Sequence, residues 1–226
     1  MASDRVNASR PLPRGRHRLP HGEVVENQRR RLIEAVPIAV REKSFASVTV
    51  EDISAHAGVS RRTFYENFRD AEDCFLASYR QYAQEVLTVA SGAAAAGSDW
   101  QERARFALQA LLRYLAERPD VAHMAVIEVL AAGPVALAER DQAVALLASL
   151  IGDEALAVSP APAPPLLLEV IAGATLQLIY ARVLAGASEQ LEELLPTIMY
   201  LVLVALYGPA GAATKSGLLP AKLVRD

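Results

Sequence analysis

The feature that most constrains this chain is residues 48–68, VTVEDISAHAGVSRRTFYENF, where two helix signals flank a tight turn. Thr49 is placed to cap the first helix, and Asp52 three residues later resembles the acidic member of a capping box. Gly58 can adopt the left-handed conformation that ends this helix, and Ser60 can cap the second. Two short helices joined by such a turn, with arginines opening the second, predict a helix-turn-helix that reads DNA.

The polar side chains of the second helix and of its caps are the candidates for DNA contacts. An arginine can donate two hydrogen bonds to guanine, and hydroxyl groups can bind phosphate. The expected base contacts come from Arg61, Arg62, Tyr65 and Asn67. The expected phosphate contacts come from Thr49, Ser60, Thr63, Tyr65 and Arg69. An ordinary helical hairpin with solvated arginines has the same spacing, so spacing alone leaves that alternative open.

This segment resembles the DNA-binding domain of the TetR family of bacterial repressors, clearly so from about residue 25 to 80. The resemblance is carried by Thr49, Ile53, Ala57, Gly58, Val59, Ser60, Thr63, Phe64, Tyr65 and Phe68. Three positions depart from the family pattern and weaken the expectation of DNA binding. Glu51 stands where some members extend an arginine, Glu66 adds a negative charge to the second helix, and Ala71 replaces a lysine usually presented to phosphate. Arg69 is close enough to substitute for that lysine.

The charge is divided unequally along the chain. The net charge is −3, but residues 1–69 hold 13 Lys or Arg against 8 Asp or Glu, and residues 70–226 hold 10 against 18. This places the positive potential that DNA binding needs at the N-terminal end. Residues 1–22 carry five arginines and three prolines with few large apolar side chains, so they are expected to be a disordered basic arm. Such an arm either lies on DNA phosphates and in a minor groove or is a solvated tail without a role.

The remaining pattern predicts an all-α protein with a small N-terminal domain and a larger helical domain. The expected domains are the arm 1–22, a three-helix DNA-binding domain 23–69, a ligand-binding and dimerisation domain 70–208, and a loosely ordered tail 209–226. The expected helices beyond the DNA-reading pair are 23–43, 70–91, 100–117, 120–132, 135–152, 165–186 and 189–207. Pro37 inside the first of these predicts a kink or break. Ser44 follows it where the family usually has glycine.

The last two predicted helices are apolar over more than one stripe, so they need cover on several sides. The resemblance implies that they pair with their copies in a four-helix homodimer interface; the alternative is that they form the core of one subunit. The expected interface residues are Leu167, Ile171, Ala174, Leu195, Ile198, Met199 and Val202. The resemblance also implies a small-molecule effector between the helices of the large domain. The expected pocket residues are Trp100, Phe106, Tyr114, Met124, Glu128, Gln177 and Tyr180.

No pattern for catalysis, cofactor binding or metal binding emerges from the four histidines or from the carboxylates. The single cysteine, Cys74, excludes an internal disulfide and fits a reducing cytoplasm; a redox sensor is the alternative. No apolar run reaches the roughly 18 residues that span a bilayer. We therefore expect a cytoplasmic homodimeric repressor that binds a DNA operator and is released by an unidentified effector. The alternative function is a TetR-like ligand-binding or scaffold protein with weak or no DNA binding.

Overall fold

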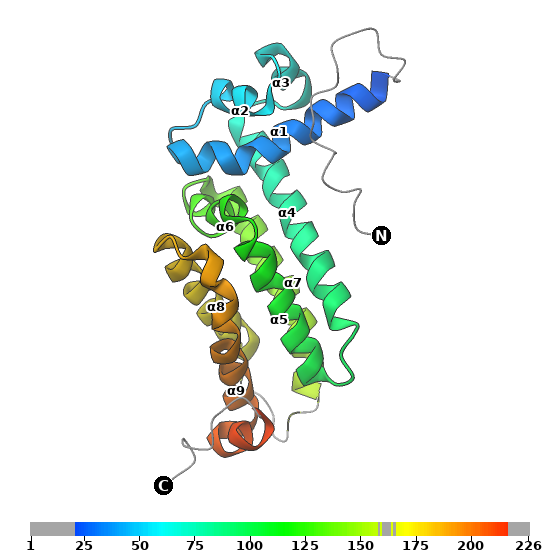
Figure 1. The fold of residues 1–226 in the computed structure, drawn as a ribbon, viewed down its shortest axis with the longest axis vertical. Helices are drawn as coiled ribbons and strands as arrows, with labels where there is room; N and C mark the ends of the chain where they lie inside the picture. The colour runs from blue at the N-terminus through cyan, green and yellow to red at the C-terminus, as the bar shows by residue number, and fades with distance from the viewer. Residues whose placement is uncertain (1–20, 158, 160–163, 165, 217–226) are drawn as a thin grey trace.

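The computed structural model describes residues 21–157, 159, 164 and 166–216, and the regular elements in these ranges are all helices. The helices pack into a small domain at one end and a longer bundle below it (Figure 1). Their bounds are α1 His21–Lys43, α2 Val50–Ala57, α3 Arg61–Asn67, α4 Ala71–Ala94, α5 Trp100–Ala116, α6 Pro119–Val126, η1 Glu128–Leu130, α7 Gly133–Ala157, α8 Leu167–Leu184, η2 Ser188–Leu194 and α9 Leu195–Ser216. The all-α prediction and the order of the two domains are confirmed.

The helix ends in the small domain have the causes expected from the sequence. The Thr49 hydroxyl accepts the backbone N–H of Asp52, and the Asp52 carboxylate accepts the N–H of Thr49, which completes a capping box. Gly58 ends α2 with a φ of 62°, in the left-handed region that favours glycine. Ser60 caps α3 by accepting the N–H of Thr63. Ser44 takes a φ of 61° directly after α1, so a serine holds the left-handed position.

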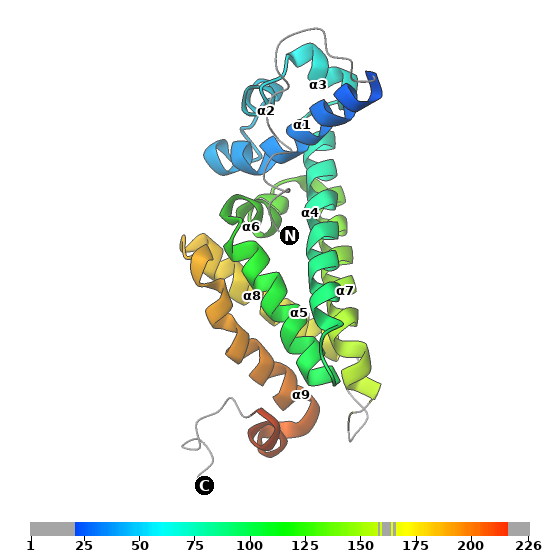
Figure 2. The ribbon, with the colours of Figure 1, turned by 45° about the vertical axis from the view of Figure 1, so that its right-hand side comes forward.

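The three small helices and the start of α4 enclose one core. Its fully buried side chains include Leu32, Val36, Val40, Ile53, Phe64 and Phe75. Met124 of α6, Val129 of η1 and Ala136 of α7 belong to the same cluster, so the core does not stop at the domain boundary. α4 runs from this core down the length of the bundle (Figure 2). Packing in the two domains is therefore continuous.

Several element boundaries differ from the sequence expectation. α1 continues through the buried Pro37 as one helix rather than ending there. The predicted helix 120–132 is divided into α6 and η1. The expected loose tail is helical as far as Ser216, after a kink at Gly208 where φ is 70° and ψ is 172°. The expected basic arm lies outside the described residues, apart from the first turn of α1.

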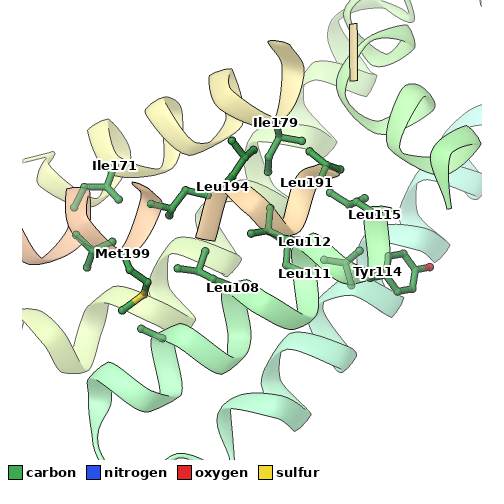
Figure 3. Packing of buried hydrophobic residues seen from close by; sticks show 14 of the residues in the cluster. Leu108, Leu111, Leu112, Tyr114, Leu115, Ile171, Ile179, Leu191, Leu194 and Met199 are labelled. Atoms are coloured by element: carbon green, nitrogen blue, oxygen red, sulfur yellow. The ribbon is translucent and has the colours of Figure 1, made fainter. Parts of the chain in front are cut away.

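The bundle consists of α4, α5 and α7 alongside one another, with α8 and α9 on one side (Figure 2). Leucines of α5 interleave with leucines of η2 and with Met199 of α9 (Figure 3). Contrary to the sequence expectation, two segments, Leu167–Leu184 and Ser188–Pro209, are long and apolar enough to cross a membrane by length and composition alone. This is weak evidence for a span, because helices in the core of a soluble protein pass the same test.

Candidate DNA-reading surface and ligand cavity

The N-terminal half of α3 faces solvent and carries two arginines. The side chain of Arg61 is 62% exposed and that of Arg62 is 89% exposed. Arg61 Nη1 lies 2.6 Å from Oε1 of Glu51 on α2, and Arg62 Nε lies 3.0 Å from Oε1 of Glu66 one turn along α3. Both pairs are solvent-exposed, and such pairs contribute little stability. The arginines are therefore held by carboxylates that another acceptor can replace.

The remaining expected DNA contacts are divided between exposed and locally bonded groups. Tyr65 is exposed, and its ring makes an edge contact with Phe64. Asn67 is half-buried, and its amide donates to the Thr63 carbonyl oxygen at 2.8 Å. Arg69 Nη2 lies 3.4 Å from Oδ1 of Asp73, so this cation is also paired with a carboxylate. The Asn67 amide is therefore used in a hydrogen bond within α3.

Two arginines of α1 attach the helix-turn-helix to its support. Arg29 donates to the carbonyl oxygen of Asn67 at 3.0 Å and lies 4.2 Å above the centre of the Phe68 ring. Arg31 donates to the carbonyl oxygen of Gly58 at 3.0 Å, and a Cβ at Gly58 would lie 2.6 Å from Nη2 of Arg31. Both guanidinium groups therefore bond to carbonyl oxygens at helix ends, Arg29 at the end of α3 and Arg31 at the end of α2.

A cavity of about 160 Å³ lies within the bundle. Its walls come from α4, α5, α6, α7, α8 and α9, and nearly all lining side chains are hydrocarbon. The α7 wall includes the small residues Ala143, Ala148, Gly152 and Ala155 beside Val144 and Leu147. The polar groups in the lining are Tyr79 and Tyr82 of α4, Arg140 of α7 and Thr175 of α8. Apolar walls with a few polar groups are typical of small-molecule sites.

Burial controls the titration of the phenols and the thiol near this cavity. Burial raises the pKa of Tyr79 above its usual range and raises the pKa of Tyr82 to about 12, so both hydroxyls stay protonated at neutral pH. Burial also raises the pKa of the Cys74 thiol well above its ordinary value. Cys74 is fully buried, and its thiol points to the Leu32 carbonyl oxygen. An inaccessible, protonated thiol does not fit a redox sensor.

The helix α6 lies between the cavity and the DNA-binding domain. Val121 and Met124 line the cavity. The Ser78 hydroxyl lies 3.6 Å from the sulfur of Met124 and donates to the Ile33 carbonyl oxygen of α1 at 2.9 Å. At the start of α6, Asp120 accepts a hydrogen bond of 2.6 Å from Arg41 of α1. The same short helix therefore contacts both the cavity and the first DNA-binding helix.

Glu128, directly after α6, makes a second link between the domains. Its side chain is 8% exposed. Oε2 accepts the backbone N–H of Phe45 at 2.5 Å, and Oε1 lies 3.0 Å from Nε2 of His123. The Phe45 ring packs edge-on against Phe75 at 4.8 Å between centroids. Glu128 therefore fixes the connection between α1 and α2.

Comparison with known proteins supports the identity of the small domain. Residues 39–78 match the sequence model described as "Bacterial regulatory proteins, tetR family". The resemblance to the TetR family is confirmed. No curated protein sequence matches the chain.

Solved structures share the TetR-like fold across most of the chain. The fatty acid degradation regulator FadR from Bacillus halodurans has a TM-score of 0.71 and 17% identity over 80% of this chain and 96% of its own. FadR from Bacillus subtilis in complex with stearoyl-CoA has a TM-score of 0.67 and 14% identity over 79% of this chain and 98% of its own. A TetR family transcription regulator from Marinobacter aquaeolei VT8 has a TM-score of 0.64 and 23% identity over 80% of this chain and 96% of its own.

Most residues expected in the ligand pocket of this TetR-like fold lie away from the cavity. Of the seven, Met124 lines it. Trp100 stacks on Tyr207, the Tyr114 hydroxyl donates to Glu85 at 2.7 Å, and Glu128 binds Phe45. Phe106 lies beneath the guanidinium of Arg105, Tyr180 is half-buried and Gln177 is exposed. Six of the seven therefore do not line this cavity, and Trp100 and Tyr114 belong to the hydrophobic core instead; the ligand site itself stays a prediction.

The residues expected at the dimer interface divide by burial. Ile171, Ile198, Met199 and Val202 are buried within the subunit, whereas Leu167, Ala174 and Leu195 are partly exposed. Another face of α8 is open to solvent and apolar at most of its positions. It consists of Val170, Gly173, Gln177, Ala181 and Leu184, at helical spacings of three and four. Four of the expected residues therefore belong to the core of the single chain. Among the described residues, no cluster of side chains could hold a metal ion.

Proposed function

We propose that this protein is a ligand-responsive DNA-binding transcriptional regulator, acting as a homodimeric repressor that a small molecule releases from its operator. The observation that carries the proposal is the position of α6. Its residues form part of the cavity wall, its first turn binds α1 through Asp120, and Glu128 of the following η1 binds the connection after α1. A ligand that displaces α6 acts directly on the support of the DNA-reading helix.

DNA recognition is proposed for the exposed face of α3. In a helix-turn-helix the second helix enters the major groove with its first residues against the bases. Arg61 and Arg62 occupy those positions, and both are exposed. Thr63, Tyr65 and the hydroxyls of the two caps flank them as phosphate ligands. Binding requires each arginine to exchange its carboxylate for a base edge.

Homodimer formation is proposed through α8 and α9. Val170 and Leu184 on the open face of α8 are 64% and 60% exposed, and Tyr200 of α9 is also exposed. A Cβ at Gly173 would meet no atom within 4 Å, so a neighbouring helix has room to approach closely there. With a two-fold axis at this face, the same apolar side chains of both subunits are buried against one another. The pair of subunits then presents two DNA-reading helices to successive major grooves.

Ligand binding is proposed for the cavity between α4 and α9. The FadR structure from Bacillus subtilis holds stearoyl-CoA, which shows that a relative of this fold binds a small molecule. The cavity lining is apolar enough to accept an organic ligand and not large charged molecules as a whole. Such a regulator acts on DNA, so we place it in the cytoplasm rather than in a membrane.

The alternative is a TetR-like ligand-binding or scaffold protein with weak or no DNA binding. One observation favours it: Lys43, Arg61, Arg62 and Arg69 of the small domain each lie within 4 Å of a carboxylate oxygen. Residues 21–69 hold eight Lys or Arg against seven Asp or Glu, so this part of the chain offers little net attraction for phosphate.

An electrophoretic shift assay with DNA from upstream of the protein's own gene separates the two functions. A regulator gives a shifted band that unlabelled specific DNA removes by competition. The Arg61→Ala, Arg62→Ala double variant should give a weaker band. The matched control is Arg113→Ala, a charge change on the outer surface of α5. Loss of the band in both variants, or no band with the wild-type protein on any upstream fragment, supports the alternative.

A further inference from the structure

The cavity has a direction, because the one cationic residue among its described lining residues, Arg140, lies at one end of the α7 wall. Along α7 the lining extends from Arg140 to Ala155, which corresponds to about 22 Å at 1.5 Å per residue. Arg140 lies at the start of this stretch, and Tyr79 of α4 is close enough to be influenced by its charge. Beyond them the α7 wall is Ala143, Val144, Leu147, Ala148, Gly152 and Ala155. The site is thus a long apolar space with a cation at one end.

The hydroxyl of Tyr79 has no partner among the described residues. Tyr79 is 6% exposed and stacks against Phe75, yet its hydroxyl makes no hydrogen bond with a described residue. Thr175 also lines the cavity, and its hydroxyl makes no hydrogen bond with a described residue either. Because Tyr79 lines the cavity, its hydroxyl is available to donate a hydrogen bond to a ligand that brings an acceptor oxygen.

Arg140 is positioned at the boundary between the cavity and solvent. Its side chain is 21% exposed, and its Nε and Nη2 donate to Oδ1 of the neighbouring Asp141 at 3.0 and 2.7 Å. Asp141 itself is 66% exposed, and an ion pair with such a partner is weak. Nη1 of Arg140 makes no hydrogen bond with a described residue. The other nearby carboxylate, Glu139, is taken up by Arg80 at 2.6 Å.

We propose that the cavity binds an anionic amphiphile, with one long hydrocarbon chain against the apolar wall of α7 and an acidic head group at Arg140 and Tyr79. The inference rests on the proposed role of this cavity as the ligand site. The hydrocarbon chain of the ligand covers the apolar cavity wall and removes it from water, which favours binding. The head group accepts hydrogen bonds from the guanidinium and from the phenol at the edge of the protein. A free carboxylate and the anionic head of a coenzyme A thioester share this chemistry.

Titration calorimetry on the full-length protein tests the proposal with palmitate, palmitoyl-CoA and the neutral hexadecanol. We expect palmitate or its thioester to bind, and each methylene removed from the chain to weaken binding about fourfold. Arg140→Gln weakens binding of the anion roughly tenfold to a hundredfold, as for loss of a hydrogen bond to a charged group, and leaves hexadecanol unchanged. Tyr79→Phe weakens it to a smaller extent. Binding of palmitoyl-CoA alone identifies the thioester as the source of the anion.

Two control variants complete the experiment. Arg113→Gln removes a cation that lies outside the cavity and pairs with Glu192, so binding should not change. Ala148→Phe places a ring in the cavity and should abolish binding of every chain. Equal binding of hexadecanol and palmitate, no effect of Arg140→Gln, or no binding of any of the three compounds would overturn the proposal.

The shift assay separates this inference from the proposed function. If palmitate binds in an Arg140-dependent way but does not change operator affinity, the amphiphile site is supported. Release of DNA by this ligand is then refuted. Release of operator by a different compound, together with no binding of the amphiphiles, keeps the regulator and refutes the amphiphile site.

Discussion

The backbone N–H of Phe45 donates a 2.5 Å hydrogen bond to the carboxylate of Glu128, although the two residues are 83 positions apart in the chain. One residue precedes the helix-turn-helix and the other directly follows α6. Because α6 also lines the cavity, this bond lies between the cavity and the helix-turn-helix. The two domains share buried contacts, since residues of α6, η1 and α7 belong to the same hydrophobic cluster as the three N-terminal helices.

Glu128→Ala should lower the free energy of unfolding by about 1–3 kcal/mol, because it leaves the Phe45 N–H without its acceptor and His123 without its carboxylate. Glu128→Gln keeps an acceptor oxygen, so it should lower the free energy of unfolding by a smaller amount. Urea denaturation followed by circular dichroism measures both values. Glu117→Gln, on an exposed side chain, is the control and should be neutral. Equal stability of the wild type and Glu128→Ala would show that the bond contributes nothing.

Arg61→Ala should reduce affinity for specific DNA more than affinity for random DNA. A bidentate contact between arginine and guanine is worth roughly 1–3 kcal/mol of discrimination. Glu51→Gln should act in the opposite direction, since it frees Arg61 from a 2.6 Å ion pair and removes a negative charge near DNA. Fluorescence anisotropy with operator and scrambled duplexes measures both effects. Equal losses on the two duplexes would assign Arg61 to phosphate.

The helix-turn-helix was predictable because its signals are local. Thr49, Asp52, Gly58 and Ser60 cap or end helices through bonds to residues within four positions, and the structure shows these bonds. The cavity was not predictable in the same way. Tyr79 and Arg140 are about 60 positions apart in the chain and line the same cavity only because α4 packs on α7. From sequence alone the alanines of α7 are ordinary helix-forming residues, and only the tertiary structure shows that they line a cavity.

The sequence also could not predict which face of α8 and α9 is buried within the subunit. Both helices are apolar around most of their circumference, so periodicity cannot distinguish a face turned to the subunit core from one turned to a partner. Val202 and Val170 are equivalent by residue type. The structure buries Val202 to 4% exposure and leaves Val170 at 64%. Tertiary packing alone decides between them.

Acid should destabilise the small domain through Asp52. Hydrogen bonds from Lys43, and from the hydroxyl and backbone N–H of Thr49, together lower the pKa of the Asp52 carboxyl to about 2. A lowered pKa in the folded state contributes stability above the unfolded value near 4, and this contribution is lost as the pH falls from about 4 to about 2. The stability difference between wild type and Asp52→Asn should therefore be constant near neutral pH and narrow across that window. Denaturation at a series of pH values tests this, and a difference that stays constant down to pH 2 would contradict it.

Deletion of residues 1–20 should leave the fold unchanged and flatten the salt dependence of DNA binding. This segment carries five arginines, whereas residues 21–69 are nearly balanced in charge. Removing one arginine from a DNA phosphate changes the slope of log K against log salt by about 0.9. Anisotropy at several salt concentrations gives the slope, and circular dichroism checks the fold. An unchanged slope would make the segment a tail without a role in DNA binding.

Val170→Glu should convert the protein to a folded monomer with weakened operator binding. Val170 is exposed in the single chain, so the charge costs the subunit little. At a two-fold interface the charge is buried and duplicated, and an unpaired buried charge costs several kcal/mol. Val202→Glu places the same charge in the subunit core and should unfold the chain instead. Val89→Glu, an exposed valine on α4, controls for the substitution itself and should remain dimeric. Light scattering and circular dichroism on the three variants distinguish these outcomes. A dimeric Val170→Glu with normal DNA affinity would place the interface elsewhere, because no arrangement that buries this face tolerates two opposed carboxylates without loss of affinity.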